Sequence, residues 1–332
     1  MNRPTIDAAT ARQDGPLALV IGATGGIGGA LAERLLAEGW RVRAAHRDPE
    51  RARSTNVPAG LDWVKADALD AGAVTAAADE AEIIVHAVNP PAYRNWSGLQ
   101  MPMLESSLAA ARTSGARILF PGTVYNYGPD VFPRIGEEAP QNPVTRKGAI
   151  RVRMETALRE AGVRFLIVRA GDFFGPRPGN NWLSQGVVRA GRPVAAVSYP
   201  GPLEVHHAWA FLPDVAETFA RLLNTPLADQ AVFHMEGHAI TGHELVAGLE
   251  AAAGRRLAVK RTPWLALAAV APFNETLREL QEVRYLWRET VLLDNTRLRA
   301  SLGEEPRTPL IEALRTALAG QGSLPASLID AA

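Results

Sequence analysis

A glycine-rich stretch follows a short apolar run near the start of the chain, in the order Gly22-Ala23-Thr24-Gly25-Gly26-Ile27-Gly28. Glycines in such a stretch permit a tight turn, a close approach of the backbone to a phosphate, and close packing of a helix on a sheet. The apolar run at 17–21 predicts a buried strand, and apolar residues at helical spacing over 30–38 predict a helix ended by Gly39. The start of that helix offers free N–H groups and a positive dipole end. We therefore predict that all seven residues bind the pyrophosphate region of a dinucleotide.

The end of the next predicted strand, at 41–45, indicates which dinucleotide binds. Proteins that bind NAD usually place an acidic side chain about 20 residues after the glycines, where it bonds the ribose 2′-hydroxyl. This chain has His46-Arg47-Asp48 there. A guanidinium matches a 2′-phosphate, which a carboxylate would repel. We expect Arg47 to favour NADP(H); NAD remains the alternative if Arg47 is only solvated and Asp48 serves a ribose.

Strands and helices alternate through the first half of the chain, which indicates how these residues are positioned. Further strands are predicted at 62–65, 83–88, 117–120 and 164–169, with helices that include 103–114 and 151–161. This alternation predicts an α/β fold with a doubly wound parallel sheet of the Rossmann type. Prolines and glycines then become dense over 175–202, and a smaller C-terminal α+β substrate lobe is expected. The expected divisions are a disordered leader at 1–15, an NAD(P)-binding Rossmann domain at 16–170, and the lobe at 171–332, from which 210–235 returns to the Rossmann core.

Two helix starts in the lobe carry capping signals. Asp214 is followed three residues later by Glu217, and Thr241 is followed by Glu244. Each pair has the spacing of a capping box, so Asp214 and Thr241 are both predicted to be N-caps.

The glycine spacing, Gly22-x-x-Gly25-x-x-Gly28, resembles that of the extended and atypical short-chain dehydrogenase/reductases, the family of sugar-nucleotide epimerases and dehydratases. The resemblance covers about 17–176, although Ile21 stands where relatives usually have Thr. Asp67-Ala68-Leu69-Asp70 resembles the segment after the third strand, where the Asp meets the adenine, and His86-Ala87-Val88-Asn89 resembles the end of the fourth. The resemblance implies cofactor contacts from Asp67, Ala68, Ala87, Val88 and Asn89. His86 is expected to be buried and hydrogen-bonded.

The catalytic pattern of that family, a Ser or Thr with Tyr-x-x-x-Lys, is only partly present. Thr123 falls at the hydroxyl position in a segment that resembles the family's fifth strand, where it binds either a substrate oxygen or its own backbone. Relatives commonly have a Glu four residues after the Lys, so Glu155 assigns Arg151 to the Lys slot and Lys147 to the Tyr slot. Arg151 can still donate hydrogen bonds to the cofactor ribose, but it does not exchange a proton near neutral pH.

Three side chains are candidates for the missing proton donor. Lys147 beside Arg151, in a partly desolvated cleft, is expected to have a lowered pKa and so to act as an acid; otherwise it binds cofactor or an anionic substrate. Tyr125 lies two residues after Thr123 and shares its face if the strand continues. Tyr93 follows the fourth strand at the edge where ligands bind. Either tyrosine could instead only line the cleft.

These residues suggest an NADP(H)-dependent oxidoreductase or epimerase-like enzyme acting on a small carbonyl or hydroxyl substrate. The second hypothesis is a non-catalytic NADP(H)-binding redox sensor or regulatory module, since the tyrosine of the family pattern is missing. The two differ in whether a usable proton donor lies within about 3 Å of the substrate oxygen.

Composition narrows the range of partners. The chain has 35 Lys plus Arg and 35 Asp plus Glu, so charge gives no reason to expect nucleic acid or a membrane surface. There are no cysteines, and the histidines lack metal-site spacing, so no metal is expected. The apolar stretch at 264–273 is too short to span a bilayer. We expect a cytoplasmic protein with a small-molecule substrate; a homodimer is compatible with the sequence but nothing in it indicates one.

Overall fold

The computed structural model describes residues 15–55, 57–90, 95–177 and 181–324. The expected leader, apart from Gly15, lies outside the described residues, and so does Tyr93.

The central sheet has seven strands, all parallel, in the order β11-β7-β5-β4-β1-β2-β3. Its strands are β1 (Leu17–Ile21), β2 (Arg41–His46), β3 (Asp62–Lys65), β4 (Ala81–His86), β5 (Arg117–Thr123), β7 (Phe165–Ala170) and β11 (Gln230–His234). The strand order reverses at β1, which pairs with β4 on one side and β2 on the other. This is the doubly wound arrangement predicted from the sequence, and ligands of such sheets bind at the carboxyl ends of the strands near this reversal.

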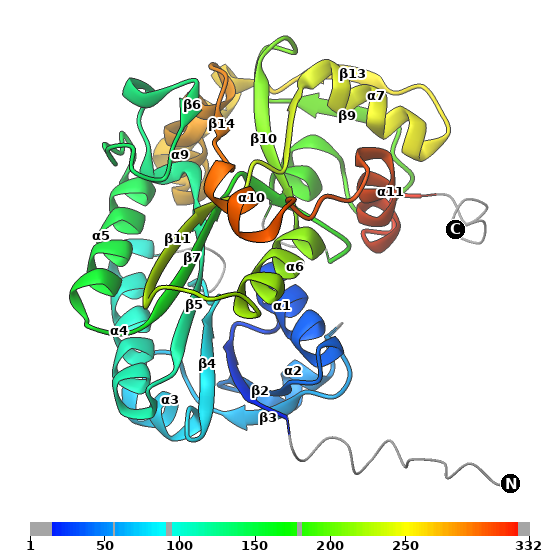
Figure 1. The fold of residues 1–332 in the computed structure, drawn as a ribbon. Coiled ribbons are helices and arrows are strands. Elements are labelled where there is room, and N and C mark those ends of the chain that lie inside the picture. The colour runs from blue at the N-terminus through cyan, green and yellow to red at the C-terminus, as the bar shows by residue number, and fades with distance from the viewer. Residues whose placement is uncertain (1–14, 56, 91–94, 178–180, 325–332) are drawn as a thin grey trace, which may run out of the picture.

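Helices cover both faces of the sheet, as Figure 1 shows. They are α1 (Gly26–Ala37), α2 (Pro49–Arg53), α3 (Ala71–Ala77), α4 (Trp96–Ser114), α5 (Arg146–Glu160) and α6 (Leu212–Leu223). Alternate residues of β1 point to opposite faces: Ala18 and Val20 pack in the core beneath α1 and α6, and Leu17, Leu19 and Ile21 in the core beneath α3, α4 and α5. Because both faces of β1 are buried, its sequence is a continuous apolar run.

The C-terminal lobe is built on small sheets above the carboxyl ends of the central strands (Figure 1). Its strands are β8 (Asp172–Phe174), β9 (Ala196–Tyr199), β10 (His206–Phe211), β12 (His238–Thr241) and β13 (Ala258–Arg261), and β6 (Arg134–Ile135) pairs with β14 (Leu292–Leu293) nearby. Its helices are α7 (Gly242–Ala253), α8 (Trp264–Val270), α9 (Glu275–Glu282), α10 (Thr296–Leu302) and α11 (Leu310–Gly320). This lobe has its own apolar core, which includes Trp209 and Trp287.

The two predicted helix caps have different outcomes. Thr241 caps α7 with a complete capping box to Glu244, as predicted. The prediction for Asp214 was wrong, because α6 begins at Leu212 with Phe211 as its N-cap. The Asp214 carboxylate instead accepts hydrogen bonds from the Thr308 N–H (2.8 Å) and hydroxyl (2.6 Å), so it ties α6 to the segment before α11. Over the described ranges, no helix combines the length and the apolar character that a bilayer crossing needs.

Candidate active site

The glycine turn between β1 and α1 leaves no room for side chains at two positions. Gly22 has φ +101°, and a Cβ there would lie 2.5 Å from the carbonyl oxygen of Ala87. A Cβ on Gly28 would lie 2.2 Å from the carbonyl oxygen of Gly22. The turn is closed by a hydrogen bond from the Gly25 N–H to the Gly22 carbonyl (2.9 Å). Glycine is thus required at Gly22 and Gly28 by close backbone packing.

The start of α1 has the features of a phosphate site. Gly25 is its N-cap and makes no side-chain cap, and the first turn carries no acidic residue. The first N–H groups of a helix without a side-chain cap can bind an anion, and the helix dipole favours negative charge there. The residues present therefore fit the pyrophosphate of a dinucleotide.

The end of β2 presents Arg47 to solvent. Within the described part of the chain, Arg47 takes part in no hydrogen bond or ion pair. Asp48 is engaged: its carboxylate caps α2 by accepting from the Arg51 N–H (3.1 Å), and its own N–H donates to His46 Nδ1 (3.0 Å). The acidic group that could have served a ribose is already used as a helix cap.

The other residues expected at the cofactor follow the ends of β3 and β4. Asp67 bonds the Leu69 N–H (3.0 Å), and the Asn89 side-chain oxygen accepts from Gln100 Nε2 (2.9 Å). Ala68, Ala87 and Val88 are half-buried at the same carboxyl edge of the sheet. His86 is buried as expected, with Nδ1 2.8 Å from the Ser107 hydroxyl. Burial, and then the charge of Arg151, lower the pKa of His86 to about 3, so it is neutral.

Thr123 and Tyr125 lie at the end of β5, but the strand does not continue through both. It ends at Thr123, and Val124–Asn126 form a 3-10 turn, so the expectation that Tyr125 follows on the same strand face was wrong. The Thr123 hydroxyl accepts from the Tyr125 N–H (3.2 Å). A hydroxyl that accepts one hydrogen bond still has its own proton to donate.

Tyr125 is hydrogen-bonded to a buried acidic side chain, Asp172, which was not among the site residues predicted from the sequence. Its hydroxyl donates to Asp172 Oδ1 (2.9 Å), and Asp172 Oδ2 lies 2.8 Å from His207 Nε2. Asp172 belongs to β8, directly after β7, and His207 belongs to β10. Asp172 comes two residues after the end of β7, and no pattern in the sequence pairs it with the distant His207.

Lys147 and Arg151 lie one turn apart at the start of α5. Lys147 Nζ is 2.8 Å from Glu279 of α9 and 4.8 Å from the ring centre of Trp96. The Arg151 guanidinium lies over the same ring, at 5.3 Å. The two neighbouring cations were predicted from the sequence, whereas the carboxylate of Glu279, which comes from α9 in the C-terminal lobe, was not.

The first turn of α5 packs directly against the turn that carries Tyr125. Thr145 caps the helix by accepting from the Gly148 N–H (2.9 Å). A Cβ at Gly148 would lie 2.1 Å from the Tyr125 carbonyl oxygen. Glycine at this position allows the two segments to pack closely, so the start of α5, which carries Lys147, lies next to the turn that carries Tyr125.

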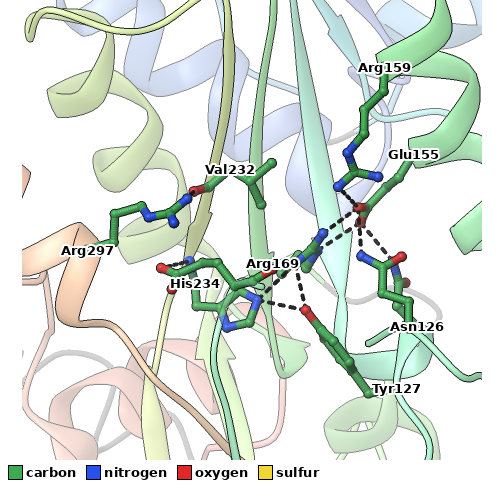
Figure 2. Close-up of polar contacts among 10 residues, drawn as sticks. Asn126, Tyr127, Glu155, Arg159, Arg169, Val232, His234 and Arg297 are labelled. Atoms are coloured by element: carbon green, nitrogen blue, oxygen red, sulfur yellow. Dashed lines mark hydrogen bonds and ion pairs between the residues drawn. The ribbon is translucent and has the colours of Figure 1, made fainter. Parts of the chain in front are cut away.

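A buried ion pair, Glu155 with Arg169, holds these segments together (Figure 2). Arg169 donates to both carboxylate oxygens of Glu155, at 3.0 and 2.6 Å, and also to the Tyr127 hydroxyl. Burial would raise the pKa of Glu155, but the hydrogen bonds and charge of Arg169 lower it overall. Glu155 is thus a structural link between α5 and β7.

The same network includes a neutral histidine, His234 of β11. Its Nδ1 donates to the Ile135 carbonyl (3.0 Å), and its Nε2 lies 3.0 Å from the Tyr127 hydroxyl and 3.1 Å from Arg169 Nη1. Burial, and then the charge of Arg169, lower the pKa of His234 to about 3. Among the described residues, no three His, Cys, Asp or Glu side chains gather as a metal site would require.

Comparison with known proteins supports this description. Residues 18–235 match the NAD dependent epimerase/dehydratase family. A 3-diazoavenalumate denitrifying reductase from a Streptomyces species is 32% identical in an alignment of 179 residues that covers 48% of this chain and 57% of the reductase. The chain therefore aligns with little more than half the length of that relative.

Two solved structures show the same fold at lower identity. MoeE5 in complex with UDP-glucuronic acid and NAD superposes with a TM-score of 0.72 at 17% identity, over 92% of this chain and 98% of that one. UDP-glucose 4-epimerase from Bifidobacterium longum, in complex with NAD+ and UDP, gives 0.68 at 16%, over 92% and 98%. The match over 18–235 covers well over half of the chain. This chain belongs to the NAD dependent epimerase/dehydratase family.

Proposed function

We propose that the protein is an NADP(H)-dependent oxidoreductase or epimerase-like enzyme that acts on a small carbonyl or hydroxyl compound. The family supports dinucleotide-dependent chemistry. The Streptomyces relative is named as a reductase, and the two structures hold NAD with a UDP-sugar or UDP. When bound, the dinucleotide supplies a hydride donor or acceptor; this chain's own residues bind it, orient the substrate and handle the proton.

The cofactor site that we propose follows the carboxyl edge of the central sheet. The glycine turn and the start of α1 bind the pyrophosphate, and Arg151 bonds the nicotinamide ribose. The remaining contacts come from the ends of β3 and β4, namely Asp67, Ala68, Ala87, Val88 and Asn89. All of these segments follow strands whose carboxyl ends share one edge.

The arrangement at the end of β2 carries the proposal of NADP(H). Arg47 is exposed and unengaged within the described chain, while the carboxylate of Asp48 is committed to capping α2. A guanidinium there can form charge-assisted bonds to a 2′-phosphate.

We propose catalytic roles for three residues around the substrate. Thr123 uses its hydroxyl proton to bond a substrate oxygen, and Tyr125 lies beside it as a proton carrier. Lys147, held by Glu279, binds the substrate or serves as a second proton source. These roles place the reacting carbon beyond the ends of β5 and β7.

Thermal unfolding in the presence of each dinucleotide tests the binding claim. A ligand that binds the native state raises the unfolding temperature according to its concentration and affinity. We expect NADPH and NADP+ at 1 mM to raise it by several degrees, and NADH and NAD+ to raise it less. Equal stabilisation by both pairs would refute the preference for NADP(H), and stabilisation by neither would refute the proposed function.

A further inference from the structure

Asp172 and His207 form a buried pair directly behind Tyr125. Their side chains are almost fully enclosed, with residue exposures of 8% and 3%. Tyr125 donates to Asp172 Oδ1 at 2.9 Å, and Asp172 Oδ2 meets His207 Nε2 at 2.8 Å. The three side chains thus form one continuous line of hydrogen bonds, from the half-buried tyrosine into the C-terminal lobe.

The partners of this line determine how many protons it holds. His207 Nδ1 lies 3.1 Å from the carbonyl oxygen of Leu286, which can only accept, so Nδ1 carries a proton. Nε2 faces a carboxylate oxygen, which also accepts unless it is protonated. The contact of 2.8 Å therefore requires one further proton between Nε2 and Oδ2. The proton between Nε2 and Oδ2 lies in a buried place where water has little access.

Aromatic rings fix the orientation of the histidine. The His207 ring stacks on Trp287 with centroids 3.7 Å apart and planes 9° apart, and Trp209 meets it edge-on at 5.3 Å. Tyr285 is a second tyrosine whose hydroxyl is influenced by the charge of Asp172. Burial, and then the charge of Asp172, raise the pKa of Tyr285, and its hydroxyl donates elsewhere, to the Tyr127 carbonyl at 2.8 Å. Tyr285 is therefore not part of the line.

The line begins where the proposed substrate lies. Thr123 and Ala170 are paired residues of β5 and β7, so the carboxyl ends of these strands are adjacent. Tyr125 follows the first by two residues, and Asp172 follows the second by two. Both side chains therefore meet at the edge of the sheet where ligands of such folds bind.

We propose that Tyr125 and Asp172 form a proton relay that His207 positions, in which Tyr125 contacts the substrate and Asp172 behind it accepts and returns the proton. This inference rests on the proposed function. In the oxidative direction the substrate O–H bond breaks and its proton goes to Tyr125 Oη. The Tyr125 O–H bond breaks at the same time, and its proton goes to Asp172 Oδ1. The electron pair of the substrate C–H bond leaves as hydride, and the oxidised dinucleotide is the acceptor.

The reverse direction uses the same bonds. Asp172, protonated at Oδ1, returns its proton to Tyr125 while Tyr125 protonates a carbonyl oxygen that has received hydride. Throughout, His207 donates its Nε2 proton in a hydrogen bond to Oδ2 and so holds the carboxyl group in place. His207 is therefore a positioning residue. In this proposal the relay takes the role of the family's tyrosine, whose position is occupied by Lys147 in this chain. The Lys147 amino group instead pairs with Glu279.

The substitution Asp172→Asn separates a relay from a structural link. The asparagine oxygen can still accept from Tyr125, and its amide can still donate to His207 Nε2, so both hydrogen bonds can remain. An amide, however, cannot take up the proton. A purely structural pair would tolerate this change, whereas a relay would not.

The experiment combines kinetics with nuclear magnetic resonance. Wild type, Asp172→Asn, Tyr125→Phe and the control Tyr285→Phe are assayed with NADPH and 4-nitrobenzaldehyde, and with NADP+ and 4-nitrobenzyl alcohol. We expect Tyr125→Phe and Asp172→Asn each to lower kcat by about 100-fold or more, the usual size of an acid–base contribution, with KM changed less than about threefold. The acidic limb of the pH profile for alcohol oxidation should vanish in Asp172→Asn. Tyr285→Phe should leave kcat and the profile unchanged.

A second readout needs no turnover. In protein labelled with ¹⁵N-histidine, wild-type His207 should show a proton on Nδ1 and a second proton shared between Nε2 and Asp172, and Asp172→Asn should show the Nδ1 proton alone. A wild-type spectrum with one proton on His207, or unchanged kcat in Asp172→Asn, would overturn the relay. These outcomes are distinct from a failure of the proposed function, which would appear as no thermal stabilisation of the wild type by any dinucleotide.

Discussion

Arg47 is the residue on which the choice of cofactor depends. Its charge is exposed at the end of β2 with no partner in the described chain, so binding a 2′-phosphate would not require it to leave another contact. We predict that Arg47→Ala weakens NADPH binding by about 10- to 100-fold, since hydrogen bonds to charged groups contribute roughly 1.5–3 kcal/mol. NADH binding should change less than about twofold.

Isothermal titration with both dinucleotides measures this effect. The matched control is Arg153→Ala, which removes an exposed arginine from α5, away from the end of β2. Equal loss of NADPH and NADH affinity in Arg47→Ala would show that Arg47 does not bind the 2′-phosphate.

Residue types could be predicted from the sequence where the signal is local. The glycines and Arg47 were selected from their spacing after predicted strands, and Thr123 from the resemblance of its segment to the family's fifth strand; the structure places all of them at the ends of β1, β2 and β5. Asp172, His207 and Glu279 act through contacts between distant segments, and no periodicity reports such contacts. The pairing of Lys147 with Glu279, for example, joins residues on α5 and α9.

At the scale of elements, the turn between β1 and α1 depends on the absence of a Cβ. We predict that Gly22→Ala destabilises the protein by about 2–3 kcal/mol, because the residue has φ +101° and the new methyl group would meet the Ala87 carbonyl. Binding of any dinucleotide should be lost as well. The control is Gly136→Ala, where a Cβ would have no heavy atom within 4 Å. Chemical denaturation and thermal shift with NADPH measure both effects; a variant as stable as the control would contradict the argument.

The Glu155–Arg169 pair links α5 to the sheet, and its loss should lower the stability of the folded protein. We predict that Glu155→Gln lowers the free energy of unfolding by about 3–5 kcal/mol, because it leaves the fully buried Arg169 without its carboxylate. Glu160→Gln, an exposed carboxylate at the end of the same helix, should change it by less than about 0.5 kcal/mol. Similar urea midpoints for the two variants would show that Glu155 contributes little.

Helix boundaries were predicted less well than helix identities. The sequence predicted a helix over 103–114, whereas α4 already begins at Trp96 and continues through Pro102. A proline inside a helix removes one N–H and weakens the helix signal. Here Trp96 is only 4% exposed, and its packing stabilises the first turns in spite of Pro102. Tertiary burial of this kind is not visible in a window of sequence.

At the scale of the whole molecule, the site is assembled from both halves of the chain. The central sheet takes β11 from the second half, and the hydrogen-bonded line from Tyr125 to His207 runs from the turn after β5 to β8 and β10. The fold class followed from the alternation of strands and helices, because that pattern repeats along the chain. The way in which the C-terminal lobe closes over the sheet could not be predicted, because its short strands and helices pair across long separations.

Three of the four buried histidines in the described chain, namely His86, His234 and His238, give the stability of the molecule a dependence on pH. Burial, followed by the charge of a nearby arginine, lowers the pKa of His86 and His234 to about 3 and that of His238 to about 4, against 6.5 for a free imidazole. The folded state keeps these groups neutral, while the unfolded chain takes up protons below pH 6.5. Stability is therefore complete above pH 6.5 and falls as the pH drops towards 4. About one pH unit or more below 6.5, each group contributes at most about 1.4 kcal/mol per pH unit, or roughly 4 kcal/mol per unit for the three; nearer pH 6.5 the slope is smaller.

Urea denaturation between pH 7.5 and pH 4.5 should show this slope. Asp214 and Glu305 act in the opposite sense, since burial raises the pKa of each carboxyl. Both are present in the wild type and in a histidine variant alike, so the difference between the two slopes isolates the histidine. We predict that His238→Gln reduces the slope between pH 6.5 and 5 by about a third, because one of the three groups is gone. His243→Gln, a change at an exposed histidine, should leave the slope unaltered. A wild-type stability that stays constant from pH 6.5 to pH 5 would mean that the three imidazoles accept protons in the folded state, and that their burial does not control the acid limit of the fold.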